Sequence, residues 1–462
     1  MPHNRHGRLP QQLRHIGFAS SETAFLIVFS LILAFGGFSL LNILIVGSGG
    51  REHAIAWRCT QEGHKVYCTP GNPGIATVAE CIPLEAQTPD HFLQVANLVH
   101  ADLTIVGPEA PLVGGIVDHF ESHGRRVFGP RANAAQLEGS KSFSKEFMAR
   151  HDIPTARFQV FDSLDEAKLG LARFDYPVVL KADGLAAGKG VVIARDKADA
   201  VAALESLFSG ELVGAAGSRV LMEDFWRGEE VSFIAICDHD TALALPPTQD
   251  HKNIFDNDEG PNTGGMGAYC DDRILTSGQK AHVLEHIILK TLRGMAAEGA
   301  PFRGFLYAGL MMTADGPKVL EYNVRLGDPE TQALLYRIEG GFVETILAAT
   351  QHKLPTAKLE LSPGATACVV MAAHGYPSQV RTDDVIHGLD QVQNATVFQA
   401  GTKASEGRIV TAGGRVLGVT AKGADLQSSL NHAYDAVEKI KFDGMQFRRD
   451  IGQKGLKRYT NG

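Results

Sequence analysis

Short apolar runs recur along the first third of the chain, separated by stretches long enough to form helices. Residues 42–46 are the first run, and residues 66–68, 103–106 and 126–129 follow. Continuous apolar runs are typical of strands that are buried on both faces of a parallel sheet. The pattern therefore predicts a doubly wound α/β domain that extends to about residue 140.

The rest of the chain mixes helices with strands that pair locally, which is typical of α+β domains. Helices are expected at residues 140–151, 164–172, 279–298 and 426–440. Strands are expected at residues 178–181, 191–194, 219–225, 230–237, 305–313 and 319–324, and then at 366–371, 396–399, 408–411 and 416–421. Residues 249–269 are expected to be a long polar loop. The expected fold class is α/β and α+β, ending in a small, mostly-β C-terminal domain.

The first forty residues differ from the rest of the chain. Residues 1–21 are basic and irregular, and residues 24–41 are almost continuously apolar, as in a signal peptide or a marginal membrane anchor. No convincing small-x-small cleavage site precedes the first domain, and the apolar run continues without a linker into the strand at 42–46. We expect residues 1–41 to be a translated leader or a mis-called start outside the fold, with an anchor as the alternative.

Length, charge and cysteine content narrow the class of protein. A chain of 462 residues has room for two to four domains, which we expect at 42–142, 143–352 and 353–452. The net charge of −8 argues against a general nucleic-acid binder, which needs a basic face. The six cysteines include no CxxC pair, so neither a zinc knuckle nor a disulfide scaffold is indicated. A cytoplasmic location fits best.

Residues 319–334 constrain the chemistry more tightly than any other stretch. In the strand at 319–324, period-two alternation places Glu321 and Asn323 on one face. A carboxylate and an amide oxygen are hard ligands that suit Mg²⁺ beside nucleotide phosphates. Arg325 follows, where it could hold an anion, and Glu330 could orient its neighbours. Taken alone, the stretch could also be an edge strand that ends in a turn.

Glycine-rich loops follow three of the strands in the first domain. Residues 47–53 are expected to be a loop that opens a helix through Trp57, but Glu52 stands at the third glycine position of the dinucleotide fingerprint. The loop still offers backbone N–H groups that suit one phosphate. Similar loops are expected at 72–74 and 107–109. Three such loops at strand ends favour a binding crevice over three turns with no role in binding.

A second glycine-rich segment, residues 181–190, connects two strands and is not a Walker loop. Lys181 lies at a strand end, and Lys189 lies in the flap between Gly188 and Gly190, so the segment could clamp polyphosphate. A flexible, solvated hairpin is the alternative. Further on, Glu223 and Phe225 form a hinge whose backbone could read an adenine edge. Glu230 could then accept the ribose hydroxyls.

The order and spacing of six residues resemble the ATP-grasp fold, in which two α+β lobes close over ATP. The six are Lys141, Lys181, Glu223, Glu230, Glu321 and Asn323. Five segments narrow the resemblance to the phosphoribosylamine–glycine ligase family: residues 49–54, 181–190, 249–252, 262–268 and 325–330. The last reads Arg-Leu-Gly-Asp-Pro-Glu, that family's signature. The similarity runs from residue 42 to about residue 449.

The resemblance implies the second step of purine synthesis, in which 5-phosphoribosylamine, glycine and ATP give glycinamide ribonucleotide, ADP and phosphate through glycyl phosphate. ATP would lie between a mobile lid, at about residues 155–222, and the hinge. Mg²⁺ or Mn²⁺ would bind Glu321 and Asn323. Many ATP-grasp enzymes carry a further metal carboxylate on the preceding strand, but residues 305–312 contain no acid.

The resemblance also implies roles for the remaining site residues. Lys181 and Lys189 would neutralise the phosphoryl group in transfer, Arg325 would hold the glycine carboxylate or the acyl phosphate, and Asp250 would hold the ammonium. ATP would contact Lys141, Lys181, Gly188, Lys189, Gly190, Glu223, Phe225 and Glu230. The phosphoribosyl group would lie against Gly49, Gly50 and the loop at residues 264–267. The full set of expected substrate-binding residues is Gly49, Gly50, Asn72, Pro73, Gly74, Gly265, Gly267 and Arg325.

Other functions stay open at this point. The nearest is another ATP-grasp carboxylate–amine ligase of purine synthesis. A dehydrogenase is disfavoured by the failed fingerprint, and an inactive membrane-anchored binding protein is allowed only by residues 1–40. We expect a monomer or weak dimer that acts on small molecules, without nucleic-acid or membrane partners.

Overall fold

The computed structural model describes residues 40–185, 190–210 and 218–460. Most of the predicted leader, and the predicted site residues Gly188 and Lys189, lie outside these ranges. Within the described ranges, no helix has both the length and the apolar character that crossing a membrane requires.

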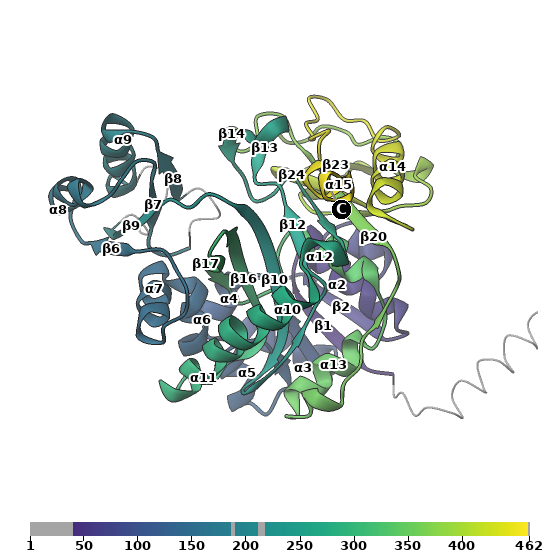
Figure 1. Ribbon diagram of the computed structural model, residues 1–462. Coiled ribbons are helices and arrows are strands. Elements are labelled where there is room, and N and C mark those ends of the chain that lie inside the picture. Colours follow the sequence, from purple (N-terminus) through teal and green to yellow (C-terminus); the bar gives the residue numbers. More distant parts are fainter. Residues whose placement is uncertain (1–39, 186–189, 211–217, 461–462) are drawn as a thin grey trace, which may run out of the picture. The chain divides into compact units, whose positions relative to one another are not determined.

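A five-stranded parallel sheet opens the fold (Figure 1). Its strands are β1 (Asn42–Gly47), β2 (Lys65–Pro70), β3 (Glu80–Cys81), β4 (Leu103–Val106) and β5 (Val127–Phe128), in the order β3-β2-β1-β4-β5. The helices between them are α2 (Gly50–Gln61), α3 (Pro89–Leu98), α4 (Glu109–Val113), α5 (Ile116–Ser122) and α6 (Ala132–Gly139). The strand order reverses between β1 and β4, where ligands of such sheets commonly bind. The predicted doubly wound domain is confirmed, with β3 as an additional short strand.

A four-stranded antiparallel sheet follows α7 (Lys141–Arg150). It consists of β6 (Phe158–Phe161), β7 (Val178–Ala182), β8 (Val191–Ala194) and β9 (Val220–Asp224), in the order β6-β9-β7-β8. The helices α8 (Leu164–Gly170) and α9 (Lys197–Phe208) pack on it, and a separate apolar core that includes Phe161, Leu180 and Leu204 joins helices and sheet. This unit, here called the lid sheet, carries Lys181 and Glu223.

A nine-stranded sheet joins the middle of the chain to its C-terminal part. Its strands are β10 (Glu229–Asp238), β11 (Thr241–Ala244), β12 (Thr248–Asp250), β15 (Gly267–Cys270), β16 (Arg303–Thr313), β17 (Gly316–Asn323), β20 (Ala365–Ala372), β21 (Thr396–Gln399) and β24 (Arg415–Gly423). The expected antiparallel pair at 305–313 and 319–324 is present as β16 and β17.

The prediction of a long loop at 249–269 is wrong. The segment holds β12 and β15, which connect β10 to β20, and a hairpin of β13 (Asn253–Phe255) and β14 (Glu259–Asn262). Its polar residues suggested exposure, yet Gln249 is buried and its Nε2 donates to the Glu230 carbonyl oxygen at 2.6 Å. Strands are predicted from alternating apolar residues, and a strand whose buried side chains are polar lacks that alternation. Its polar side chains are buried because they form hydrogen bonds with distant strands.

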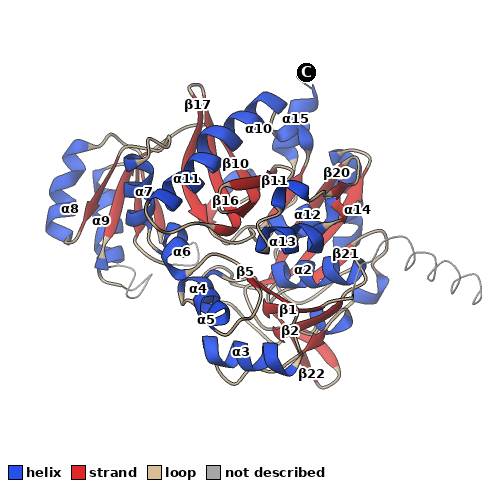
Figure 2. Cartoon of the chain, turned by 90° about the horizontal axis from the view of Figure 1, so that it is seen from below, coloured by secondary structure: helices blue, strands red, loops and turns tan. Residues whose placement is uncertain are grey.

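Helices complete the structure. The expected helix at 279–298 is continuous but contains a π turn (Leu284–Ile288) between α10 (Ser277–Val283) and α11 (Leu289–Ala297). The others are α12 (Glu330–Arg337), α13 (Phe342–Thr350), α14 (Leu426–Val437) and α15 (Gln453–Thr460), with the short strands β18 (Ile338–Gly340), β19 (Glu360–Leu361), β22 (Thr402–Ser405) and β23 (Arg408–Thr411). α12 packs against α2 and against β15 and β20 (Figure 2).

Candidate active site

A cavity of about 430 Å³ is lined by the lid sheet, the nine-stranded sheet and loops of the five-stranded sheet. Ten predicted site residues line it: Lys141, Lys181, Gly190, Glu223, Phe225, Glu230, Asp250, Glu321, Asn323 and Arg325. Seven predicted residues are not among its lining residues: Gly49, Gly50, Asn72, Pro73, Gly74, Gly265 and Gly267. The structure thus brings the predicted ATP and metal residues together although Lys141 and Asn323 lie 182 positions apart in the sequence.

Glu321 and Asn323 project from the end of β17. They lie two residues apart and therefore on the same face of the strand. Asn323 Oδ1 accepts a hydrogen bond from Arg325 Nη2 at 3.0 Å. Burial by itself would raise the pKa of Glu321, but nearby lysines, Lys252 and Lys181 foremost, outweigh it and lower that pKa. Glu321 is therefore an ionised carboxylate at neutral pH.

The ammonium group of Lys252 lies between two carboxylates. Its Nζ forms an ion pair with Glu230 on β10 and lies 3.9 Å from Glu321 Oε1 on β17. A positive charge between these oxygens shows that the site stabilises a cation. The oxygen donors of Glu321 and Asn323 fit a hard divalent cation such as Mg²⁺ or Mn²⁺. β16 supplies no acid here; Glu230, the other carboxylate beside Lys252, lies on β10 opposite Met311 of β16.

A buried carboxylate holds two lysines at the junction of α7 and the lid sheet. Glu223 on β9 forms ion pairs with Lys181 of the neighbouring strand β7 and, at 2.5 Å, with Lys145 of α7. Lys145 Nζ also donates to Thr155 Oγ1 at 2.7 Å. Burial lowers the pKa of Lys145 to about 8, against the opposing effect of Glu223. The side chain of Glu223 thus keeps a pair of cations in the cavity wall.

The lid sheet is tied to the start of α7 on its other side. Lys141 Nζ donates to the Gly184 carbonyl oxygen at 2.8 Å. The Asp183 carboxylate accepts from the backbone N–H of Ser142 at 3.1 Å and from the hydroxyls of Ser140 and Ser142. Because Asp183 follows Lys181 by two residues, these bonds fix where the glycine-rich segment leaves β7.

Arg325 lies among acidic groups of helices α4 and α6, which follow strands of the five-stranded sheet. Its guanidinium is 2.8 Å from the carboxylate of Glu138 on α6 and 3.3 Å from that of Glu109 at the start of α4. Although burial disfavours the charged form, Glu138 and Glu109 raise the pKa of Arg325. The guanidinium is thus a fixed positive charge in the cavity wall, positioned by residues of the parallel sheet.

Asp250 lies on β12 in the middle of this charge cluster. Burial raises its pKa to about 8, and the carboxylates of Glu330 and Glu230 add to the rise, while Lys252 opposes it. A carboxyl group in such a place gains from an additional cation, because a positive charge relieves both repulsion and desolvation. Asp250 is therefore suited to bind an ammonium group.

Glu52 explains why the first glycine loop departs from the dinucleotide fingerprint. Helix α2 begins at Gly50, earlier than predicted, with Gly49 as its N-cap. The Glu52 carboxylate accepts from the Gly49 N–H at 2.6 Å and pairs with the Arg51 guanidinium. A Cβ atom on Gly107 would overlap the Glu52 side chain. The Glu52 side chain thus fills the space between the loop that follows β1 and the loop that follows β4.

The remaining predicted glycine loops pack against the C-terminal part of the chain. Asn72 Nδ2 donates to the carbonyl oxygens of Ser48 and Gln399, both at 2.8 Å, and a Cβ atom on Gly74 would meet Gln399. Gly265 has φ +114° and would meet Pro329 if it carried a side chain. The structure therefore places these loops at contacts between parts of the fold, next to the cavity.

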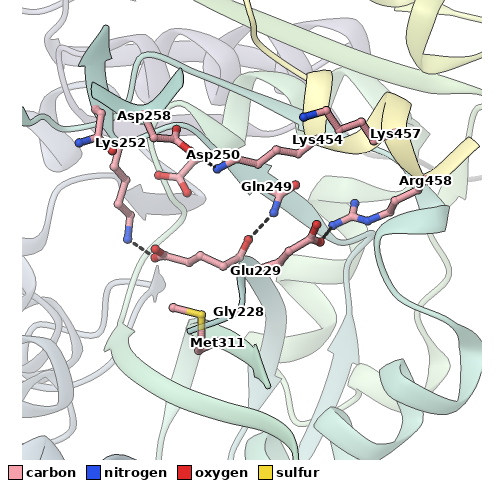
Figure 3. Close-up of a pocket in the computed structure, with 12 residues that line it drawn as sticks. Gly228, Glu229, Gln249, Asp250, Lys252, Asp258, Met311, Lys454, Lys457 and Arg458 are labelled. Atoms are coloured by element: carbon pink, nitrogen blue, oxygen red, sulfur yellow. Dashed lines mark hydrogen bonds and ion pairs between the residues drawn. The ribbon is translucent and has the colours of Figure 1, made fainter. Parts of the chain in front are cut away.

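A second cavity, of about 700 Å³, shares Glu230, Asp250 and Lys252 with the first (Figure 3). Helix α15 lines its other side. There Lys454 lies 2.6 Å from the carboxylate of Asp258, and Arg458 forms an ion pair with Glu229. The charge cluster around Asp250 is thus reached from two sides.

Comparison with known proteins places the chain in a family. Models of phosphoribosylglycinamide synthetase match it in three consecutive parts: the N domain at residues 41–138, the ATP-grasp (A) domain at 139–331 and the C domain at 366–454. A phosphoribosylamine–glycine ligase from Pseudomonas aeruginosa is 46% identical over 425 residues, covering 90% of this chain and 99% of that protein.

The chain belongs to the phosphoribosylglycinamide synthetase family.

A crystal structure of phosphoribosylamine–glycine ligase from Thermotoga maritima agrees with this assignment. It is 35% identical, covers 89% of this chain and all of that one, and has a TM-score of 0.79. The biotin carboxylase domain of the Hydrogenobacter thermophilus 2-oxoglutarate carboxylase has a TM-score of 0.68 at 17% identity, a likeness of fold alone. The family predicted from the motifs is confirmed, and so is the ATP-grasp fold.

The first cavity also includes charged residues that were not predicted from the sequence. Lys145, Lys252, Glu109, Glu138 and Arg415 all line it. Lys145 had a usable signal, because it lies one helical turn after Lys141. The others had none: Arg415 lies 87 positions from Asp328, yet its Nη2 is 3.2 Å from the Asp328 carboxylate.

Proposed function

We propose that this protein is an ATP-dependent ligase that joins glycine to 5-phosphoribosylamine, giving glycinamide ribonucleotide, ADP and phosphate. The observation that carries the proposal is the cavity in which Lys141 and Lys181 face the carboxylate of Glu321. Lysines beside a hard-cation site are what phosphoryl transfer from a nucleotide requires. Family membership supports the substrate pair, because the relatives are named for phosphoribosylamine and glycine.

ATP would bind in the first cavity. Lys141, Lys181 and the flap residues Gly188, Lys189 and Gly190 would neutralise and contact its phosphates, since charge on the transferred group must be stabilised where it develops. The hinge at Glu223 and Phe225 would contact the adenine, and Glu230 the ribose. Glu223 would act on the phosphates indirectly, because its carboxylate forms an ion pair with Lys181 and holds that side chain in place.

Glu321 and Asn323 would hold Mg²⁺ or Mn²⁺, which would neutralise phosphate charge when bound. Asp250 would bind the glycine ammonium and Arg325 its carboxylate or the acyl phosphate. A small zwitterion needs one acid and one base, and both side chains line the cavity.

The proposed reaction has two steps. A glycine carboxylate oxygen attacks the γ-phosphorus, the bond to ADP breaks, and glycyl phosphate forms. The amine of phosphoribosylamine then attacks the carbonyl carbon, phosphate leaves with that oxygen, and the amine loses a proton. The protein needs no covalent nucleophile, because positioning and electrostatic stabilisation supply the rate.

The phosphoribosyl group would bind along the glycine loops, at Gly49, Gly50, Asn72, Pro73, Gly74, Gly265 and Gly267, with Arg325 at the reacting end. The proposed domains are 42–142, 143–352 with a lid at about 155–222, and 353–452. We also propose a cytoplasmic monomer or weak dimer without nucleic-acid or membrane partners, which light scattering after size-exclusion chromatography would check.

The test of the reaction is ADP formation with each substrate omitted in turn. ADP should form only when ATP, glycine and phosphoribosylamine are all present. Glycine labelled with heavy oxygen in its carboxylate should pass one labelled oxygen to phosphate. AMP and pyrophosphate as products, or unlabelled phosphate, would contradict the acyl-phosphate route. ADP formation with a different carboxylate and amine, but not with these, would favour another ligase of the ATP-grasp type.

A further inference from the structure

Three metal-ligating side chains meet at the end of β10 that is opposite to the active site. Asp238 is the last residue of β10, His239 begins the turn to β11, and His352 follows α13. Glu230, in the active-site cavity, lies on the same strand eight residues earlier, which corresponds to roughly 26 Å. The cluster is therefore separate from the nucleotide site and independent of the proposed function.

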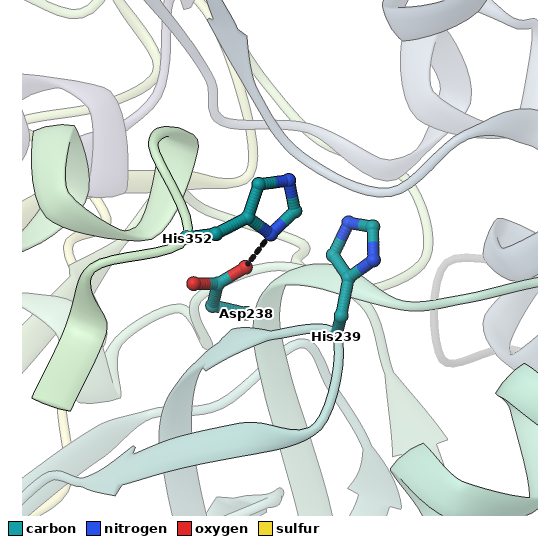
Figure 4. A group of neighbouring side chains, drawn as sticks. All are labelled: Asp238, His239 and His352. Atoms are coloured by element: carbon teal, nitrogen blue, oxygen red, sulfur yellow. Dashed lines mark ion pairs between the residues drawn. The ribbon is translucent and has the colours of Figure 1, made fainter.

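The donor atoms of the cluster converge. One atom from each side chain lies within 4.8 Å of the others. Figure 4 shows the His352 ring next to the Asp238 carboxylate and the His239 ring beside the His352 ring. Asp238 is only 2% exposed, and its Oδ1 lies 2.8 Å from Nδ1 of His352, an ion pair when that ring is protonated. A buried carboxylate needs a positive partner, which either a protonated imidazole or a bound cation supplies.

Backbone conformation adds a separate observation. His239 has φ +53° and His352 has φ +56°, both in the left-handed region that favours glycine. His239 lies in a two-residue hairpin turn between Asp238 and Thr241, and His352 lies just past the end of a helix. Both are positions where glycine or asparagine is the unstrained choice. The two histidine rings are in contact, with their centroids 4.4 Å apart.

The charges around the cluster leave room for a cation. Arg303 opposes Asp238 across the β10–β16 pair, but its guanidinium forms an ion pair with Glu121. The rings of His239 and His352 each offer one nitrogen to the shared position, and imidazole nitrogen is a common metal ligand.

The geometry points to a transition-metal site formed by Asp238, His239 and His352, of the class that binds Zn²⁺. Two imidazole nitrogens and one carboxylate oxygen form a common zinc ligand set, whereas Mg²⁺ and Ca²⁺ prefer oxygen ligands alone. Zinc bond lengths of about 2.0–2.2 Å place ligand atoms about 3.3 Å apart, so small side-chain rotations would close the set. The metal would tie the β10–β11 turn to the segment after α13.

Zn²⁺ binding to the full chain is the direct test. The protein is titrated with Zn²⁺ in competition with a chromophoric chelator, in excess Mg²⁺ so that the nucleotide-site carboxylates do not compete. We compare the unmodified protein with His352→Gly, which removes a ligand while relieving the strained backbone, so the variant should fold. Asp238→Asn removes the charged ligand instead.

Two control variants match the change. His100 also follows a helix, α3, and has φ +49°, so His100→Gly makes the same backbone change away from the cluster. His282→Ala removes one ring of the His282–His286 pair, one helical turn apart and able to bind metal weakly.

The expected result is one tightly bound Zn²⁺ per chain, with affinity at least about 100-fold lower in His352→Gly and Asp238→Asn. His100→Gly and His282→Ala should retain it. Zn²⁺ should also raise the melting temperature of the unmodified protein and of His100→Gly, but not of His352→Gly. Absence of a tight site, or equal affinity in His352→Gly, would overturn the assignment.

Discussion

Replacing Glu223 by glutamine should destabilise the protein strongly, because two buried lysines would lose their counter-charge. The change keeps the shape of the side chain and removes only its negative charge. Glu223 pairs with Lys145 and Lys181, and all three side chains are less than 10% exposed. Removing one partner of a buried ion pair typically costs about 3–5 kcal/mol.

The lowered pKa of Lys145 allows the cost to be worked out in more detail. The fall from 10.5 to about 8 means that burial already costs about 3 kcal/mol at neutral pH, even with Glu223 present. Without Glu223 the pKa falls further, and Lys145 loses its proton in the folded state. Deprotonating a group of pKa about 8 at pH 7 adds about 1 kcal/mol. Lys181 also loses its ion pair, so we expect a total near the lower end of the general range, about 3 kcal/mol.

The deficit should shrink as the pH rises. In the unmodified protein the unfolded chain holds the Lys145 proton up to pH 10.5, whereas the folded chain releases it near pH 8, so stability rises between these values. In Glu223→Gln the folded pKa is lower, and the rise begins at a lower pH. Above about pH 8, Lys145 is neutral in both folded proteins, and the gap should be about 1 kcal/mol smaller at pH 9 than at pH 7.

Urea unfolding at pH 7 and pH 9 measures both effects, because urea does not screen charges. Far-UV circular dichroism and tryptophan fluorescence should give coincident transitions if the unfolding is two-state. Glu205→Gln is the matched control: it breaks the ion pair to Lys168 at 2.7 Å on the same lid sheet, with the Glu205 side chain 54% exposed. It should cost less than about 1 kcal/mol. If Glu223→Gln is no less stable than this control, the account of the buried lysines is wrong.

Three further outcomes are expected. Glu321→Gln should lower kcat by orders of magnitude with an unchanged circular dichroism spectrum. Asn323→Ala should lower kcat less, since it removes a neutral ligand. Near-normal turnover of Glu321→Gln at low Mg²⁺ would contradict the metal assignment. Because the pKa of Asp250 is raised to about 8, the free enzyme holds it protonated below that pH, so kcat/KM for glycine should rise up to about pH 8; a flat profile would exclude Asp250 as the ammonium ligand. Asn72→Ala should lower the free energy of unfolding by about 1–3 kcal/mol, through the lost hydrogen bonds to Ser48 and Gln399; an unchanged urea midpoint would show that this contact is dispensable.

The parts of the site that were predictable from sequence are those determined by a few neighbouring residues. Glu321 and Asn323 share a face because strands have a period of two, and the structure places both on β17 as expected. Lys181 was expected at a strand end before a glycine-rich connection, and β7 ends one residue after it. Backbone geometry over a few residues determines such features, so a short sequence motif is enough to predict them.

The parts that were missed depend on contacts between distant segments. Gln249 looked like a loop residue, yet the Glu230 carbonyl oxygen and the Tyr269 hydroxyl satisfy its side chain in a buried strand. Lys252 had no assigned role, yet it lies between carboxylates of β10 and β17. Neither fact can be read from spacing, because the partners come together only when the sheet assembles.

The sequence by itself determined the fold class and the family, and it supplied the residues proposed to hold metal and phosphate, since alternation, glycine placement and the Arg-Leu-Gly-Asp-Pro-Glu segment are local patterns. Tertiary structure decided how those ligands are charged and held. It paired Glu223 with two lysines, surrounded Arg325 with Glu109 and Glu138, and joined the C-terminal strands to the sheet that bears Glu321. The physical reason is that burial and charge pairing depend on neighbours in space, and these lie as far apart in the chain as Glu109 and Arg325.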